Sequence, residues 1–207
     1  ACYYAMKCLV DPNLPSNAGL ARVVETKFRE GSILDPIYPG AVNAYMPTAQ
    51  AVTEAILLAL GPVVPEKRIA GSGGTGGMAI GGRGKDGKTW VMYEIHGTAT
   101  GARYGIDGVS ATSVHIGNGR ITPLEILESE FPVKMKRFDL IADSGGAGEF
   151  RGGLGFVREY EILSESRLST RSTRHVVAAV GTKGGADGAL GRVLINPGTP
   201  EEKSLPA

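Results

Sequence analysis

Glycine gathers in three dense clusters, and this distribution constrains the fold more than any other feature of the sequence. The clusters span residues 71–87, 144–155 and 181–191, and glycine makes up 31 of the 207 residues, about twice the usual share. Because it has no side chain, glycine lets a backbone amide come close to a ligand or to another backbone. No Gly-X-Y repeat is present, which excludes collagen. The intervening segments are apolar and alternating, so the pattern predicts a folded, strand-rich protein with glycine-rich connecting loops.

The size and charge of the chain limit its function class. A chain of 207 residues suits one large domain or two small ones with a substantial core. Its formal net charge is +1, and its basic residues are scattered among acids, so we expect no nucleic acid partner. No apolar run reaches the roughly 18 residues that span a membrane, so we expect no membrane partner.

The start of the sequence carries both cysteines. Cys2 and Cys8 lie six positions apart, on different faces of a helix, where they are poorly placed for a disulfide. This predicts a reduced, cytoplasmic location. The opening residues, Ala1-Cys2-Tyr3-Tyr4-Ala5, have neither an initiator Met nor a signal-peptide layout. We therefore expect residues 1–207 to be an interior portion of a larger subunit.

The pattern of apolar residues predicts an α+β fold with a few helices and mixed or antiparallel sheets. A first helix is expected to end by Val10, and a short one to cover 123–130. The strongest helix signal is 49–60, with Thr48 as N-cap, Gly61-Pro62 as stop signal and apolar residues all round, which indicates a buried helix. Strands are expected at 22–30, 89–95, 112–116, 133–141, 156–163, 166–174, 176–180 and 192–196.

Two nucleotide-binding patterns match by letter within the first cluster. Residues 71–76 fit the dinucleotide fingerprint, and residues 82–89 fit the P-loop pattern. Both motifs need a helix directly after the glycines to hold the phosphate, and β-forming sequence follows instead. Lys85-Asp86-Gly87-Lys88 predicts a hairpin with a type I′ turn in place of a P-loop.

A first candidate site follows the strand at 89–95. His96 follows this strand directly, and Arg103 and Asp107 lie in the glycine-rich loop that comes next. The imidazole of histidine can act as acid, base or metal ligand near neutral pH. We take these three residues as catalytic candidates. In the structural alternative, His96 caps the strand while Arg103 and Asp107 pair to order the loop.

A second candidate site lies in the densest cluster, 143–155. Successive amides at Ser144, Gly145 and Gly146 can form an anion-binding nest, with Arg151 as a clamp. In the alternative, the segment is a tight crossover in which Arg151 pairs with Glu149 or Asp143. Two further histidines are more isolated: we expect a structural role for His115, whereas His175 sits beside arginines on an anion-facing or a solvated edge.

Several segments together resemble the hydantoinase B family. They are residues 14–19 (LPSNAG), 37–42 (IYPGAV), 101–108 (GARYGIDG), 122–132 (TPLEILESEFP) and 143–155 (DSGGAGEFRGGLG). The similarity covers nearly the whole chain, and the last segment is the most specific. Two stretches depart from the family pattern, at 98–100 and at 181–185, so substrate contacts there are expected to differ.

The resemblance implies a function and a set of partners. A hydantoinase A-like subunit would use ATP to phosphorylate a cyclic amide, and this subunit would bind the activated intermediate. A divalent metal would belong to an N-terminal half outside this sequence, a glycine-rich C-terminal tail would also lie outside it, and no metal ligand is expected within residues 1–207. Arg103 and Arg151 would clamp phosphate or carboxylate. Two alternatives remain open: a subunit of an ATP-dependent acetone or acetophenone carboxylase, and a non-catalytic scaffold in a hetero-oligomer.

Overall fold

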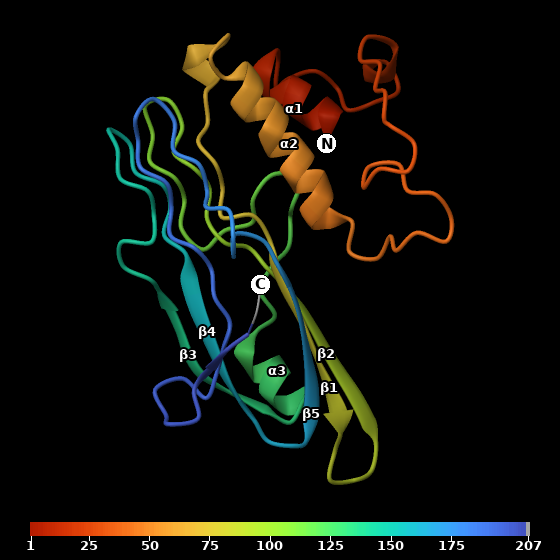
Figure 1. Ribbon diagram of the computed structural model, residues 1–207, viewed down its shortest axis with the longest axis vertical. Helices are drawn as coiled ribbons and strands as arrows, with labels where there is room; N and C mark the ends of the chain where they lie inside the picture. The colour runs from red at the N-terminus through yellow and green to blue at the C-terminus, as the bar shows by residue number, and fades with distance from the viewer. Residues whose placement is uncertain (206–207) are drawn as a thin grey trace.

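The protein has an α+β fold built from short helices and three small antiparallel sheets, as the sequence predicts (Figure 1). The computed structural model describes residues 1–205. The helices α1 and α2 lie at one end, and α3 with the larger sheets lies at the other. None of the helices within residues 1–205 has the length and apolar character needed to cross a membrane. Both cysteines are free thiols.

Helices α1 (Cys2–Leu9) and α2 (Met46–Leu60) pack together at the top of the molecule. Their shared apolar cluster consists of the buried side chains of Ala5, Leu9 and Leu57. Helix α2 begins earlier than predicted, after Tyr45, because Pro47 suits the first turn of a helix. Thr48 is therefore inside the helix, and its prediction as N-cap is wrong.

The buried face of α2 is largely polar, which contradicts the prediction of an all-apolar buried helix. Gln50, Thr53 and Glu54 are buried there. The Glu54 carboxylate accepts hydrogen bonds from the amide (2.9 Å) and hydroxyl (2.7 Å) of Ser72, and it forms an ion pair with Arg174. Helix α2 thus holds the glycine-rich segment after residue 70 through charge and hydrogen bonds, because buried polar groups need partners.

The largest sheet has the strand order β2-β1-β5, with all neighbours antiparallel. Its strands are β1 (Gly76–Arg83), β2 (Thr89–His96) and β5 (Ser166–Ser172). A hairpin joins β1 to β2, so residues 71–89 form neither a P-loop nor a dinucleotide fingerprint followed by a helix. Only Gly87 in the turn has a positive φ (79°), and its amide donates to Gly84 O. The predicted type I′ turn, which needs two positive φ values, is therefore wrong.

A second sheet pairs β3 (Val133–Leu140) with β4 (Phe156–Ile162), and α3 (Leu124–Glu130) precedes it. Alternation along β2 turns Trp90, Met92 and Glu94 toward this second sheet. The main core cluster lies between the sheets and contains Ile80, Met92, Leu127 and Val133. A third, very short sheet pairs β6 (Leu194–Ile195) with β7 (Lys203–Ser204).

Four predicted strand segments differ in the structure. Residues 22–30 begin with the last residue of the 3₁₀ turn Leu20–Arg22 and continue as a loop, since no neighbouring strand pairs with them among residues 1–205. Residues 112–116 form a loop that ends in a turn at 115–116, because Ala111 and Ile116 adopt positive φ values that an extended strand excludes. Residues 176–180 follow Arg174, which also has a positive φ, and form a loop. The predicted strand at 192–196 shortens to two residues before Asn196, where φ is again positive.

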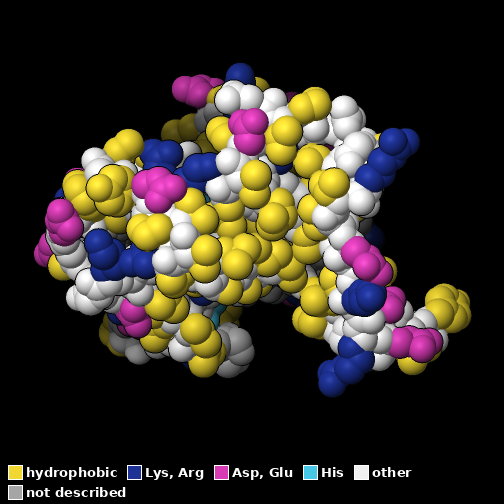
Figure 2. Space-filling model, turned by 90° about the horizontal axis from the view of Figure 1, so that it is seen from above, with side chains coloured by type: hydrophobic (Ala, Val, Ile, Leu, Met, Phe, Trp, Pro, Cys, Tyr) yellow, Lys and Arg dark blue, Asp and Glu magenta, His cyan; other side chains and the backbone are white. Residues whose placement is uncertain are grey.

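The segment between α1 and α2 forms an extended arm beside the main body (Figure 1). It exposes large apolar side chains at Val23, Phe28, Ile33, Ile37, Tyr38, Val42 and Tyr45. Seen from above, the helical end of the molecule shows hydrophobic side chains across its centre and charged side chains toward its edges (Figure 2).

The loops rich in glycine pack against one another, backbone to backbone, and we call this arrangement the glycine layer. It consists of residues 68–75, 97–110, 144–155 and 173–191. Amide-to-carbonyl hydrogen bonds join the four segments: Ala70 to Ala102 (2.8 Å), Gly71 to Val180 (2.8 Å), Gly153 to Thr100 (3.0 Å) and Ala186 to Ala147 (2.8 Å). A Cβ atom at Gly101, Gly108, Gly145, Gly146 or Gly153 would lie within 3.0 Å of a backbone atom. These glycines thus serve the close approach of another backbone.

Candidate functional site

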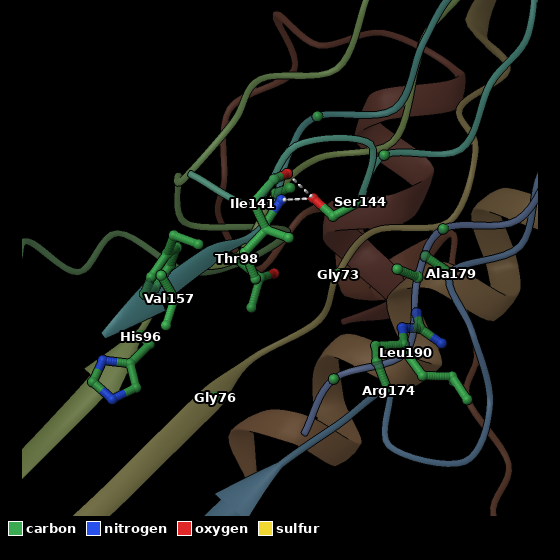
Figure 3. A pocket seen from close by; sticks show the side chains of 18 of the residues that line it. Gly73, Gly76, His96, Thr98, Ile141, Ser144, Val157, Arg174, Ala179 and Leu190 are labelled. Carbon is green, nitrogen blue, oxygen red and sulfur yellow. Dashed lines mark hydrogen bonds between the residues drawn. The ribbon is translucent and has the colours of Figure 1, made fainter. Parts of the chain in front are cut away.

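The glycine layer borders a large cavity of about 2210 Å³, which residues of β4 and β5 also line (Figure 3). In this view, His96 at the end of β2 lies on one side and Arg174 on the other. Five of the seven residues proposed from the sequence line the cavity: His96, Arg103, Ser144, Gly145 and Gly146. Asp107 and Arg151 do not line it. The structure therefore brings together most of two candidate sites that are distant in the sequence.

His96 is the last residue of β2 and is partly buried beside β4. Its ring packs edge-on against Phe156, with the centroids 6.2 Å apart. Its Nδ1 atom lies 3.1 Å from Nη1 of Arg158. Burial, and then the positive charge of Arg158, lower the pKa of His96 below its ordinary value of 6.5, whereas the Glu94 carboxylate acts in the opposite direction.

Behind His96, a buried ion pair joins β2 to β4. Nη1 of Arg158 lies 3.0 Å from Oε2 of Glu94, and each side chain is only 4% exposed. The hydroxyl of Tyr160 donates to the same carboxylate oxygen at 2.5 Å. Burial and this hydrogen bond raise the pKa of Tyr160, so the phenol stays protonated. The guanidinium also lies over the rings of Phe138 and Tyr160, at 5.2 and 5.3 Å.

Glu94 and Arg158 were not expected from the sequence to belong to the site, although the sequence places each of them on the apolar face of a predicted strand. Glu94 alternates in phase with Trp90 and Met92, and Arg158 alternates in phase with Phe156 and Tyr160. A charge on the apolar face of a strand needs a buried partner of opposite sign. The two strands supply each other with that partner.

Arg103 and Asp107 do not form the ion pair that the structural alternative predicted. The Arg103 side chain is exposed at the cavity, and it has no ion-pair partner among residues 1–205. The Asp107 carboxylate instead accepts a hydrogen bond from the backbone amide of Arg151 (2.8 Å), and the Gly108 amide donates to Arg151 O (2.7 Å). Asp107 thus ties the first loop to the 144–155 loop, away from the cavity.

Ser144 uses its hydroxyl within its own loop. The hydroxyl donates to Ile141 O (2.7 Å) and accepts from the Gly155 amide (2.9 Å), as Figure 3 shows around Ser144. The amides of Gly145 and Gly146 donate to no acceptor within residues 1–205. Both residues line the cavity, and both amides are left without an internal acceptor among the described residues. Arg151 forms no ion pair with Glu149 or Asp143, all of which lie in the described part of the chain.

Arg174 and His175 are among the other basic residues that line the cavity. The Arg174 side chain has a structural role, because its guanidinium forms an ion pair with Glu54 and donates to Ser72 O at 2.8 Å. His115 lies outside the cavity, packed beside Tyr4, and its buried Nε2 has no partner in residues 1–205. Burial lowers the pKa of His115, and Glu54 opposes that shift.

The described residues do not fit a metal ion. Within residues 1–205, no three His, Cys, Asp or Glu side chains gather closely enough to hold one. No chemical step is therefore assigned to a metal held by this part of the chain.

The two buried histidines predict a pH dependence of stability. Below pH 6.5 the unfolded chain binds protons that the folded chain does not. The free energy of unfolding should therefore fall as the pH drops toward the lowered pKa values, by at most about 1.4 kcal/mol per pH unit for each histidine. Denaturant unfolding between pH 7.5 and about 5 measures this slope. The double variant His96→Gln/His115→Gln should flatten it, and an unchanged slope would contradict the assignment.

The sequence matches one family of enzymes. The family model described as Hydantoinase B/oxoprolinase matches residues 1–206, and the chain belongs to this family. The chain is 32% identical over 183 residues to one subunit of the D-/L-hydantoinase of Pseudomonas sp. (strain NS671), covering 88% of this chain and 31% of the relative. It is 33% identical over 201 residues to 5-oxoprolinase of Dictyostelium discoideum, covering 96% and 15%.

Two solved structures have a similar fold. The ATP-dependent caprolactamase from Pseudomonas jessenii superposes with a TM-score of 0.77 at 25% identity, over 98% of this chain and 37% of that one. Nucleotide-free acetone carboxylase superposes with a TM-score of 0.73 at 18% identity, over 92% of this chain and 26% of that one. At this low identity the similarity concerns only the fold. The chain thus spans about a third or less of the first relatives that it matches.

Proposed function

We propose that this chain forms part of a subunit of an ATP-dependent cyclic-amide hydrolase. Hydantoin, 5-oxoproline and caprolactam, from which the relatives take their names, all contain an amide within a ring. A ring amide is a poor electrophile, and phosphorylation of its oxygen turns that oxygen into a good leaving group. In this proposal a hydantoinase A-like partner performs the phosphorylation with ATP, and this subunit receives the activated intermediate.

The observation that carries the proposal is the pair of unpaired amides at Gly145 and Gly146. Adjacent amides that point at one place bind oxyanions, because each contributes a hydrogen-bond donor and a partial positive charge. The Ser144 hydroxyl forms hydrogen bonds to Ile141 before the loop and to Gly155 at its end. These two bonds hold the loop, and with it the amides, in position. Arg103 adds a full positive charge at the same cavity, which suits a phosphate or a developing oxyanion.

The residues of this chain would act by binding and orientation. The glycine amides would hold the oxygen on which negative charge develops when water attacks the activated carbon. Collapse of the tetrahedral intermediate would break the ring C–N bond, with a proton passing to the nitrogen, and would leave a ring-opened acyl phosphate. A second water would then displace phosphate from this acyl group, and Arg103 would hold the departing phosphate. A metal-held water would come from outside the described residues, where the resemblance puts the metal.

The activity is tested with the protein and its hydantoinase A-like partner. Each of 5-oxoproline, hydantoin and caprolactam is incubated with ATP and Mg²⁺, and ring-opened product and ADP are measured by mass spectrometry. The proposal expects ATP-dependent ring opening of at least one of them. ATP-dependent fixation of bicarbonate onto acetone or acetophenone, without ring opening, would instead establish the carboxylase alternative. Turnover that survives loss of His96 and Arg103 would support the scaffold alternative.

Two arginines that the sequence suggested as clamps should now behave differently. Arg103→Ala should lower kcat/KM on the order of ten- to a hundred-fold, which corresponds to the loss of one hydrogen bond to a charged group. Arg151→Ala is the matched control: its side chain does not line the cavity, and its amide bond to Asp107 persists, so kcat/KM should change less than about three-fold. Equal effects in the two variants, at equal thermal stability, would contradict the clamp role of Arg103.

A further inference from the structure

The hydrogen bond between Arg158 and His96 fixes the position of the imidazole proton. A guanidinium has only donors and stays charged in proteins. Nη1 of Arg158 therefore donates to His96 Nδ1 at 3.1 Å, while the same nitrogen forms the ion pair with Glu94 Oε2 at 3.0 Å. Nδ1 must accept, so the single proton of the neutral ring is on Nε2.

The doubly protonated ring is disfavoured in the same place. An imidazolium would direct an Nδ1–H group at a guanidinium N–H, with two positive charges in contact in a largely buried setting. The lowered pKa of His96 agrees with this geometry. Phe156 packs edge-on against the ring, and Gly76 lies beside its Cδ2 edge; neither carries a charge.

The protonated Nε2 is directed at reachable space. His96 lines the cavity, and its Nε2 has no hydrogen bond to residues 1–205. Unlike Nε2 of His115, it is not among the enclosed polar atoms without a partner. The ring thus offers one free N–H donor to whatever occupies the cavity.

We infer that His96 acts as a neutral hydrogen-bond donor to a substrate oxygen, with Arg158, Glu94 and Tyr160 as its positioning residues. The occupant would be a carbonyl, phosphate or developing oxyanion oxygen. The proton stays on Nε2 throughout, so His96 is neither a general base nor a metal ligand in this state. A neutral imidazole that donates in this way stabilises negative charge on oxygen without a transfer of its proton. The role toward substrate rests on the proposed function, whereas the protonation state does not.

The protonation state is tested without any activity assay. Long-range ¹H–¹⁵N spectra of ¹⁵N-histidine-labelled protein distinguish a protonated ring nitrogen from an unprotonated one. The His96 signals are those that vanish in His96→Gln. We expect a protonated Nε2 and an unprotonated Nδ1 in most of the molecules from pH 8 down to 6.5, the ordinary pKa of histidine. A protonated Nδ1, or an imidazolium in that range, would overturn the inference.

The positioning role is tested in the same spectra. In the variant Arg158→Met/Glu94→Gln, both charges of the pair are removed together, so that neither is left buried alone. If Arg158 fixes the proton, His96 should now show a mixture of its two neutral forms. An unchanged spectrum would show that Arg158 is merely structural.

The catalytic role is tested by two isosteric substitutions. The amide nitrogen of glutamine can take the place of Nε2, whereas that of asparagine lies nearer to Nδ1. His96→Gln should therefore keep turnover within about ten-fold of wild type, and His96→Asn should lose on the order of a hundred-fold. Equal losses in both variants, or no loss in either, would overturn the donor role, while the spectra would still decide the protonation state. Circular dichroism confirms that each variant is folded.

Discussion

Replacing Arg158 by methionine is expected to lower the free energy of unfolding by about 3–5 kcal/mol. Each side chain of the pair is only 4% exposed. The substitution therefore leaves the Glu94 carboxylate buried, with the Tyr160 hydroxyl as its remaining partner. It also removes the cation from between the rings of Phe138 and Tyr160. Denaturant unfolding followed by circular dichroism measures the loss.

Two further variants identify the cause of this loss. Arg158→Met/Glu94→Gln removes the uncompensated charge, and the amide still accepts from Tyr160, so at least half of the stability should return. Arg137→Met breaks an exposed ion pair with Asp139, where both side chains are more than half exposed, and should cost less than about 1 kcal/mol. A loss at Arg158 no larger than that at Arg137 would mean that the buried pair does not hold β2 to β4.

Replacing Gly101 by alanine is expected to cost about 3 kcal/mol or more. A Cβ atom at this position would lie within 3.0 Å of the carbonyl groups of Ala70 and Gly71. Those atoms belong to a backbone that is itself fixed by hydrogen bonds, such as that from Ala70 to Ala102, so the clash cannot relax by side-chain rotation. The glycine layer would have to open, and the cavity wall with it.

Gly119→Ala provides the matched control for this substitution. Gly119 is exposed, nothing lies within 4 Å of its Cβ position, and its φ is not positive. We expect a change within about 0.5 kcal/mol there, measured by the same unfolding experiment. If Gly101→Ala were as harmless as Gly119→Ala, the packing of backbone against backbone would not be the reason for the glycines.

Local signals in the sequence were sufficient for much of the fold. The strands at 89–96, 133–140 and 156–162 follow from alternation, and Asp86-Gly87 predicts the hairpin that excludes a P-loop. The failures occur where a strand needs a partner. Residues 22–30 alternate as a strand does, yet nothing pairs with them among residues 1–205, and local alternation cannot supply a partner. Strand β1, by contrast, is central although it contains four glycines, since β2 and β5 both pair with it.

The candidate site was predictable only in part, because the sequence shows local clusters of residues but not the contacts between distant strands. The clustering of glycines with His96, Arg103 and Ser144 marks residues that do line one cavity. Sequence position alone could not separate side chains that face the cavity from those that join loops, as Asp107 and Arg151 do. Nor could it reveal that Arg158, 62 positions from His96, is the group that sets its proton. Such contacts are created by the pairing of distant strands.

Amide hydrogen exchange in the 144–155 loop tests the central claim most directly, because the amides of Gly145 and Gly146 are the groups proposed to hold the activated substrate. The protein is studied with its partner subunit, with ATP alone and with ATP plus the cyclic amide that is turned over. Exchange in peptides covering residues 144–150 should slow markedly only when ATP and the cyclic amide are both present. Unchanged exchange in these peptides during turnover, with protection confined to other parts of the protein, would contradict the claim.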